Sequence, residues 1–454
     1  MPAMESKSLR DSLKIWRDSR LRFGRRWKAH APPVNPSPAD AETPGGAFTS
    51  LATRNFLWQI SEKVLAAGVG VLVFGLIARQ YGPDVSGHYA YAMTLMQTAL
   101  GMSLVCSAGA LLPRVARMRL GVAAMLANVF VVRLVGSTIA TGLVAIYIAS
   151  SESGMRLAVT LIALASVPFM EPFYVATMYW QSRNQNRAPV LNRSCGLAVR
   201  ATLVVAAVAM NARPWVPAIA WFIEALIVAR LHLLSLKELV AGRRIAARVS
   251  AWRIRRYSAY GARFLIGVLL GTLFMRADRL VLARLLDPHE YGLYATAMQL
   301  VEAWLQVAQV IGTSIGPTYL YAALRRHQTL RAHIPVIAGL ALTGGVGLAL
   351  AVMFGEQVID LLFGARFERS YPFLVAGTAY GVLAFVDLFV VAYIAVARRP
   401  VLLTIKSATS LVTVLCALYL LFPDLQAQAG PASLAIGLLC GWLALIPFVR
   451  TGEP

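Results

Sequence analysis

Long apolar stretches recur along this chain from about residue 56 to its end, and this recurrence restricts the fold more than any other feature. A helix that crosses a bilayer needs about 20 such residues, because each adds about 1.5 Å along the axis. Hydrophobic residues make up 58% of the chain and charged residues only 14%, which a soluble globular domain does not show. The sequence therefore predicts an all-α integral membrane protein with twelve transmembrane helices, at residues 56–78, 87–111, 122–149, 155–180, 188–211, 215–236, 258–286, 290–316, 333–354, 372–396, 399–421 and 431–449.

The basic residues are sorted by side of the membrane. The segment before the first span, every second connection and the C-terminal end hold 31 of the 43 Lys and Arg residues, including those at 183–193, 237–263 and 398–406. The opposite connections hold six. This pattern places both termini in the cytoplasm and requires an even number of spans. Topology and attraction to anionic membrane lipids account for the formal charge of +22, so we expect no nucleic-acid partner.

The chain repeats one segment after 205 positions. Residues 77–93 and 282–298 agree at eight of seventeen places, and the matches include Arg79 with Arg284, Gly87 with Gly292 and Tyr89 with Tyr294. Six predicted spans separate the copies, so both have the same orientation in the membrane, as in transporters built from parallel repeats. Asp287, Pro288 and Glu290 in the second copy are typical of a helix start, and Gly82 with Pro83 can do the same in the first copy. We interpret the repeat as a duplicated scaffold rather than as a binding site.

The repeat defines the predicted domains. Residues 1–50 form a basic cytoplasmic tail with a Pro-rich linker, and residues 51–236 form an N-terminal lobe of six helices. Residues 237–257 form a basic cytoplasmic linker between the lobes, and residues 258–454 form a C-terminal lobe of six helices. Apolar residues spaced at three and four positions in the tail are also consistent with a helix that lies on the membrane surface.

The segments IARQYGPDVSGHYAYA (77–92), RADRLVLARLL (276–286) and EYGLYATA (290–297) resemble the Wzx-type polysaccharide flippases of the MATE-like (MOP) exporter superfamily. The resemblance extends over roughly residues 50–450. It implies a V-shaped pair of pseudo-symmetric six-helix lobes in the bacterial inner membrane. It also implies a polyprenyl-pyrophosphate-linked oligosaccharide as cargo, moved to the periplasmic leaflet by alternating access for surface polysaccharide or lipopolysaccharide. By family resemblance, the polysaccharide polymerase and chain-length regulator of the pathway are expected partners.

Other functions stay open at this point. A lipid II-type flippase commonly has fourteen spans rather than twelve, and a multidrug or ion antiporter of the same architecture suits cationic cargo. A membrane-embedded polymerase needs a sizeable external loop, whereas the longest external connection here covers about residues 355–371. No metal-ligand spacing or phosphate-binding loop is present in the sequence. We therefore expect no enzyme activity, no cofactor and no metal site.

Ionisable residues within the predicted spans are the candidate functional residues. A charge that faces lipid at mid-bilayer costs at least about 2.5 kcal/mol, so such residues usually face a cavity or a partner. Arginine carries a planar fork of donors that suits pyrophosphate. Candidates to line the substrate pathway are Arg133, Arg200, Arg276, Arg279, Lys63 and Glu62. Candidates for ion coupling or structural pairing are Asp278, Glu302, Asp387, Glu171 and Glu224.

Three further hypotheses concern these residues. Glu62 can neutralise Lys63, and Asp278 can neutralise Arg279. Pro168 and Pro172 on either side of Glu171 are expected to kink the fourth span. The membrane potential favours export of an anionic cargo, and coupling to H⁺ or Na⁺ through Asp278, Glu302 or Asp387 is an additional hypothesis.

Overall fold

The computed structural model describes residues 45–104, 111, 115, 118, 121–183, 185–241, 249–315, 333–396 and 399–450. The chain forms two compact units, residues 1–53 and 54–454. All regular elements of the described residues are helices, as predicted. The predicted surface helix and Pro-rich linker of the tail lie outside the described residues. Below, the first half means residues 54–236 and the second half means residues 258–450.

In the first half, each predicted span coincides with one or more helices. Span 4 is divided into three short helices around Pro168 and Pro172, where the sequence predicts a kink. The elements are α2 (Gly45–Tyr81), α3 (Pro83–Ser103), α5 (Val122–Ser151), α6 (Gly154–Ala165), α7 (Val167–Met170), α8 (Tyr174–Ser182), α9 (Arg187–Ala209), η2 (Val216–Ala218) and α10 (Ile219–Ala241).

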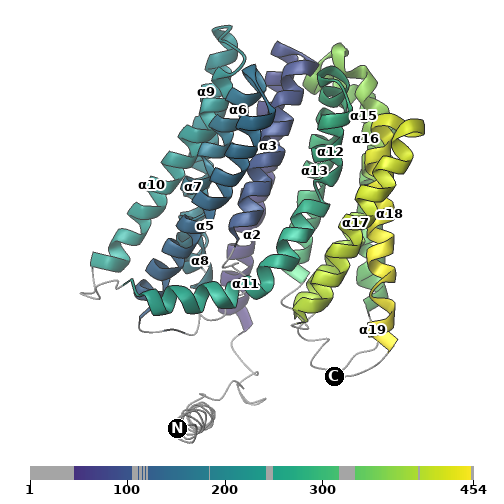
Figure 1. The fold of residues 1–454 in the computed structure, drawn as a ribbon. Helices are drawn as coiled ribbons and strands as arrows, with labels where there is room; N and C mark the ends of the chain where they lie inside the picture. Colours follow the sequence, from purple (N-terminus) through teal and green to yellow (C-terminus); the bar gives the residue numbers. More distant parts are fainter. Residues whose placement is uncertain are drawn as a thin grey trace, which may run out of the picture. The chain divides into compact units, whose positions relative to one another are not determined.

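In the second half, the predicted seventh span is not continuous. It is broken between α11 and α12, at Met275 and Arg276. The elements are α11 (Ala251–Phe274), α12 (Ala277–Leu285), α13 (Pro288–Ile315), α15 (Ile334–Phe363), η5 (Ala365–Ser370), α16 (Tyr371–Val396), α17 (Pro400–Leu425), η6 (Gln426–Gln428), α18 (Ala429–Leu443) and α19 (Ile446–Arg450). Helices α10 and α11 both extend into the predicted linker at 237–257, and α11 runs across the ends of α5 and α8 (Figure 1).

Within the described residues, eight segments are long and apolar enough to cross a membrane. They cover predicted spans 1, 3–6, 9 and 10, and the segment Pro400–Phe448 contains both spans 11 and 12. The segments that fall short are α3, α11 with α12, and α13. Helix α3 is largely buried in protein, so its sequence has less need to be apolar. A total of twelve spans stays a prediction.

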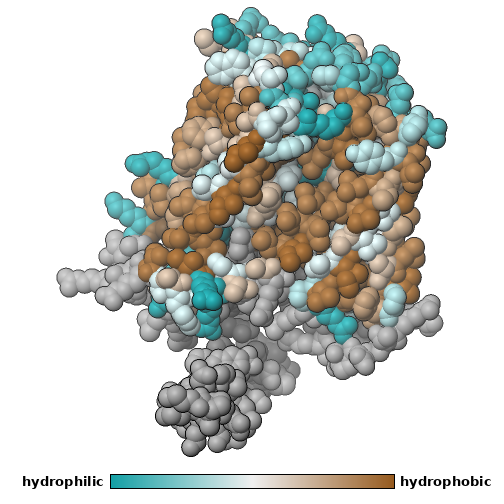
Figure 2. Space-filling model, in the orientation of Figure 1, coloured by the Kyte–Doolittle hydropathy of each residue, from teal (hydrophilic) through white to brown (hydrophobic). Residues whose placement is uncertain are grey.

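The outer surface of the helices is apolar in the middle. Leu134, Ile139 and Leu143 on α5, and Leu342 and Leu350 on α15, are exposed. Figure 2 shows the same distribution, with hydrophobic side chains over the middle of the visible face and hydrophilic side chains at its upper end. Such a wide apolar surface belongs in the hydrocarbon core of a bilayer, which is about 30 Å thick. The protein is a multi-pass membrane protein.

The two copies of the repeated segment meet each other. Helices α3 and α13 pack together, and a methyl group at Gly87 would lie 2.9 Å from the carbonyl oxygen of Pro288. A methyl group at Gly292 would overlap the carbonyl group of Pro83. Because each glycine lacks a side chain, the backbone at the start of the other copy can pack directly against it. Glycine has this role in close contacts between helices.

Candidate functional site

The break between α11 and α12 holds a buried group of charges. Arg276 and Arg279 both contact the same oxygen of Glu302 on α13, at 3.2 Å and 2.7 Å. Asp278 is fully buried, accepts a hydrogen bond of 2.5 Å from Tyr294 and lies 3.7 Å from Arg279. The predicted pairing of Asp278 with Arg279 is present. Two guanidinium groups and two carboxylates make this group, called the Arg276 cluster below, formally neutral.

The helix break has a local cause in the same residues. Arg276 has φ −129° and ψ 0°, which ends the regular helix, and the side chain of Arg279 donates a hydrogen bond of 3.3 Å to the carbonyl of Met275. A carbonyl that lost its helical partner therefore gains a charged donor. One oxygen of Asp278 is buried without a hydrogen bond. Non-helical backbone at membrane depth is tolerated where protein groups satisfy it in this way.

A second buried ion pair joins three other helices of the second half. Lys406 on α17 contacts Asp387 on α16 at 2.8 Å, and the indole of Trp442 on α18 donates to the other oxygen of Asp387 at 2.7 Å. Lys406 is 3% exposed. Lys406 was counted with the cytoplasmic charges at 398–406, and the structure places it in the second turn of α17, which begins at Pro400.

In the first half, Arg133 and Glu171 form an ion pair of 2.8 Å. Arg133 is fully buried on α5, and its guanidinium also donates to the Glu171 carbonyl at 3.3 Å and lies over the ring of Tyr174. Glu171 lies in the break of span 4, between α7 and α8. The kink therefore places both the carboxylate and the backbone carbonyl of Glu171 within reach of one arginine.

Arg200 and Glu224 form the other ion pair of the first half, at 2.9 Å between α9 and α10. Arg193, about two turns before Arg200 in α9, approaches the second oxygen of Glu224 at 3.4 Å. Arg193 belongs to the basic segment 183–193, which predicts a cytoplasmic connection, and the structure places its side chain with this pair. Arg200 also lies over the indole of Trp221.

Glu62 and Lys63 differ from the other candidates. Glu62 is half-buried on α2, within electrostatic reach of Tyr174, and Lys63 is exposed. The two side chains form no ion pair with each other, so the hypothesis that they neutralise each other was wrong.

All four candidate arginines are thus paired with candidate carboxylates. The sequence suggests a mostly cationic path, whereas Arg133, Arg200, Arg276 and Arg279 each contact Glu171, Glu224 or Glu302. A single buried charge is costly, and an opposite charge with good geometry offsets that cost. Which of these groups faces the cargo stays a prediction.

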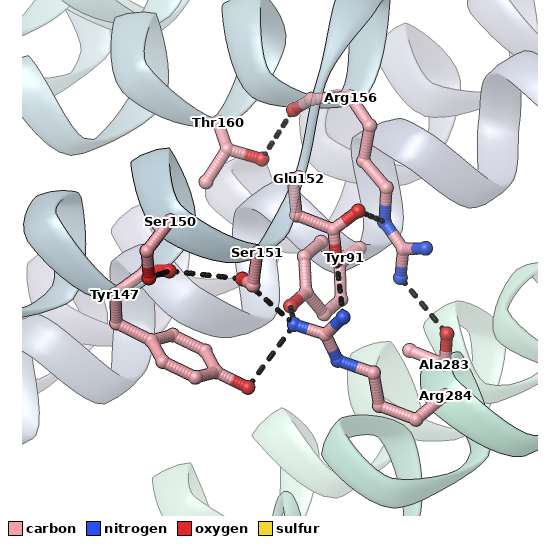
Figure 3. Close-up of polar contacts among 9 residues, drawn as sticks. All are labelled: Tyr91, Tyr147, Ser150, Ser151, Glu152, Arg156, Thr160, Ala283 and Arg284. Atoms are coloured by element: carbon pink, nitrogen blue, oxygen red, sulfur yellow. Dashed lines mark hydrogen bonds and ion pairs between the residues drawn. The ribbon is translucent and has the colours of Figure 1, made fainter.

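A further polar group joins the two halves where α12 ends, and Figure 3 shows its contacts. Arg284 of α12 forms an ion pair of 2.9 Å with Glu152, which follows α5. The same guanidinium donates to Ser151 at 3.0 Å, to Tyr147 at 3.1 Å and to Tyr91 at 3.4 Å.

Arg156 of α6 completes this group from the first half. It donates to the carbonyl of Ala283 at 3.0 Å, lies over the ring of Tyr91 at 3.9 Å and approaches Glu152 at 3.7 Å. Neither Arg156 nor Arg284 is among the predicted site residues. The match of Arg284 with Arg79 in the repeat was the available signal for a shared role.

Comparison with known proteins gives the family. Residues 52–319 match the family described as polysaccharide biosynthesis protein, which is more than half of the chain. The chain belongs to the polysaccharide biosynthesis protein family. No curated protein matches this family member.

Solved structures similar to this family member share its fold at low sequence identity. The lipid II flippase MurJ in an inward closed conformation has a TM-score of 0.64 and 12% identity, over 88% of this chain and 87% of that chain. An inward-facing multidrug resistance MATE family transporter has a TM-score of 0.63 and 14% identity, over 88% and 100%. A MOP superfamily transporter from Pyrococcus furiosus has a TM-score of 0.62 and 14% identity, over 90% and 98%. The fold is MATE-like.

Proposed function

We propose that this protein is a flippase that moves polyprenyl-pyrophosphate-linked oligosaccharide repeat units from the cytoplasmic to the periplasmic leaflet of the bacterial inner membrane. It works by alternating access and serves the synthesis of surface polysaccharide or lipopolysaccharide. The family and the MATE-like fold support a lipid-linked cargo and a transporter in general. The positive-inside pattern supports cytoplasmic termini.

The Arg276 cluster is the observation that supports an anionic cargo. Two guanidinium groups three residues apart hold one carboxylate oxygen of Glu302 between them, at a helix break in the membrane. Two convergent guanidinium groups also suit a diphosphate, because each presents charged donors in a plane. In the protein without cargo, Glu302 then binds the two arginines, and the diphosphate of the cargo replaces Glu302 when it binds.

This exchange has a consequence for energy coupling. The cluster is neutral with Glu302 ionised, so a diphosphate that displaces Glu302 leaves a carboxylate in need of a proton or another cation. Coupling to H⁺ or Na⁺ at Glu302, with Asp278 or Asp387 as alternatives, follows from that need. The membrane potential adds a driving force of about 2.3 kcal/mol per exported negative charge per 100 mV. The polymerase and chain-length regulator of the pathway are the proposed partners.

Transport into liposomes tests the function. The purified protein is expected to flip a fluorescent polyprenyl-pyrophosphate-linked oligosaccharide, and neither lipid II nor a cationic drug. Flipping of lipid II at an equal rate, or exchange of the drug, would replace this proposal with the corresponding alternative. If neither an imposed ion gradient nor an imposed membrane potential changed the rate of flipping, the coupling hypothesis would be removed.

Glu302→Gln tests the role of the cluster separately. This change frees the two arginines, so we expect tighter binding of inorganic pyrophosphate to the detergent-solubilised protein by at least about threefold, which is under 1 kcal/mol. Transport is expected to fall, because the arginines then release the cargo slowly. Arg213→Gln, at an exposed arginine, is the matched control. Unchanged pyrophosphate affinity in Glu302→Gln would show that the cluster is only structural.

A further inference from the structure

We propose that Arg284, Glu152 and Arg156 form a latch that holds the two halves together at the side opposite the termini. The proposal rests on the proposed function, because the latch must open for cargo to leave on that side. In this structure the latch is closed (Figure 3).

The latch connects elements that belong to different halves. Arg284 leaves α12 and binds Tyr147, Ser151 and Glu152 at the end of α5, and Arg156 of α6 binds the carbonyl of Ala283 in α12. The two arginines therefore cross the interface in opposite directions. Side chains of the first half therefore hold both the side chain of Arg284 and the backbone carbonyl of Ala283 in the last turn of α12.

The repeat supports this assignment independently. Arg79, the counterpart of Arg284, ends α2 and donates a hydrogen bond of 3.2 Å to the carbonyl of Leu361, near the end of α15. Each repeat arginine thus reaches the third long helix of the opposite half. Arg79 has this one carbonyl partner, whereas Arg284 has an ion pair and three hydroxyl partners. The second copy carries the stronger contact.

The charges of the latch suit a contact that breaks and re-forms. The side chain of Arg284 is 37% exposed, so its charge gains water when the halves separate. Glu152 and Arg156 lie four residues apart in the first half and already approach to 3.7 Å. When Arg284 leaves, Glu152 therefore keeps a cationic partner on its own side. Neither half is left with a buried unpaired charge.

The glycine contact has a different part in the closure. Gly87 and Gly292 let α3 and α13 approach closely, but a backbone contact of this kind offers no charge to exchange. Asp84 and His289, at the rim, approach to 3.7 Å and are exposed. The glycines therefore determine how closely the two halves approach each other, and the latch determines how long they stay closed.

Distances between spin labels test the latch without any cargo. Ser153→Cys in the first half and Asp424→Cys in the second half are exposed positions for labels, in a protein whose Cys106, Cys195, Cys416 and Cys440 are replaced by Ser. Double electron–electron resonance on the full chain in lipid nanodiscs gives the distance distribution. We expect Arg284→Gln and Glu152→Gln each to at least double the fraction at long distance.

Two controls make the result decisive. Arg213→Gln removes an exposed arginine that forms no ion pair with a residue that the structure describes, and we expect it to leave the distribution unchanged. The exchanged pair Glu152→Arg with Arg284→Glu is expected to return the distribution at least half-way to the parent, because Tyr147 and Ser151 can also donate to a carboxylate. An equal distribution in the parent and both single variants would overturn the latch.

The outcome is separable from that of the proposed function. A latch that opens in the variants while the liposomes move no saccharide would contradict the proposed cargo and leave the latch in place. Normal saccharide flipping with unchanged distances in the variants would retain the function and overturn the latch. The near-native circular dichroism of each variant, required before labelling, excludes misfolding as the cause of a longer distance.

Discussion

The two copies of the repeated segment are alike where they touch and unlike in the helices that lead into them. Both contribute a glycine to the contact between α3 and α13. In the first copy, α2 runs without a break from Gly45 to Tyr81. In the second copy the chain breaks at Met275 and Arg276. Subtracting the offset of 205, Arg276, Asp278 and Arg279 correspond to Val71, Val73 and Phe74. The shared glycines preserve the scaffold, and the charges of Arg276, Asp278 and Arg279 before the second copy have apolar counterparts before the first.

The same difference extends to the matched tyrosines. Tyr89 donates to the carbonyl of Pro214 at 2.8 Å, and Tyr294 donates to the carboxylate of Asp278 at 2.5 Å. Both side chains are buried. The matched tyrosine hydroxyl therefore donates to a neutral carbonyl in one copy and to a charged carboxylate in the other. The second copy therefore combines the structural role of the first with a contact to a buried ionic group.

Exchange of charge between the copies is expected to have the largest effect. Val73→Asp buries a carboxylate at a position that is 2% exposed and lacks the arginines of the second copy. We expect a loss of about 3 kcal/mol or more in the free energy of unfolding, measured in SDS titrations. Val73→Thr, of nearly the same volume, is the control and is expected to lose less than half as much. Equal losses would contradict the claim that the first copy cannot hold a charge.

Filling the glycine contact is expected to have the next largest effect. In Gly292→Ala the added methyl group overlaps the Pro83 carbonyl, so we expect a loss of about 2 kcal/mol in the free energy of unfolding from overpacking. Gly142→Ala is a matched control, because a methyl group there meets nothing within 4 Å. Its helix propensity rises, so its stability is expected to stay or increase. A similar loss in both variants would show that close approach is not the reason for the glycine.

Removal of the matched tyrosine hydroxyl groups is expected to have a smaller effect on the free energy of unfolding, and the loss is expected to differ between the two copies. Tyr294→Phe loses a hydrogen bond to a carboxylate and is expected to cost about 2 kcal/mol of unfolding free energy, against about 1 kcal/mol for the neutral bond lost in Tyr89→Phe. Equilibrium unfolding of both variants under one condition gives the difference. If Tyr89→Phe proved the more costly, the charged acceptor would not strengthen the second copy.

Removal of the first-copy arginine is expected to have the smallest effect. Arg79 is exposed and donates one hydrogen bond to a carbonyl, so Arg79→Gln is expected to change the unfolding free energy by less than about 0.5 kcal/mol. Its spin-label distances are expected to change less than those of Arg284→Gln. A larger shift for Arg79→Gln would reverse the assignment of the stronger latch to the second copy.

Several local features could be predicted because they depend on neighbours in the chain. Pro168 and Pro172 interrupt span 4 as expected, since proline removes a helical hydrogen bond wherever it occurs in a helix. Asp278 and Arg279 are sequence neighbours and were expected to interact, as they do at 3.7 Å. The partner of Lys406 could not be predicted in this way, because its distance from Pro400 does not reveal that α17 packs beside Asp387.

By itself, the sequence determined that this protein is a helical membrane protein with a duplicated segment, because apolar run length and self-similarity are properties of the chain alone. Tertiary structure alone decided which charge meets which. Arg284 finds Glu152 across 132 positions, and Arg200 finds Glu224 on the next helix. Such partners depend on how helices pack side by side, whereas helical periodicity predicts only the face of its own helix on which each residue lies. A buried charge must be paired, but only the packed fold selects its partner.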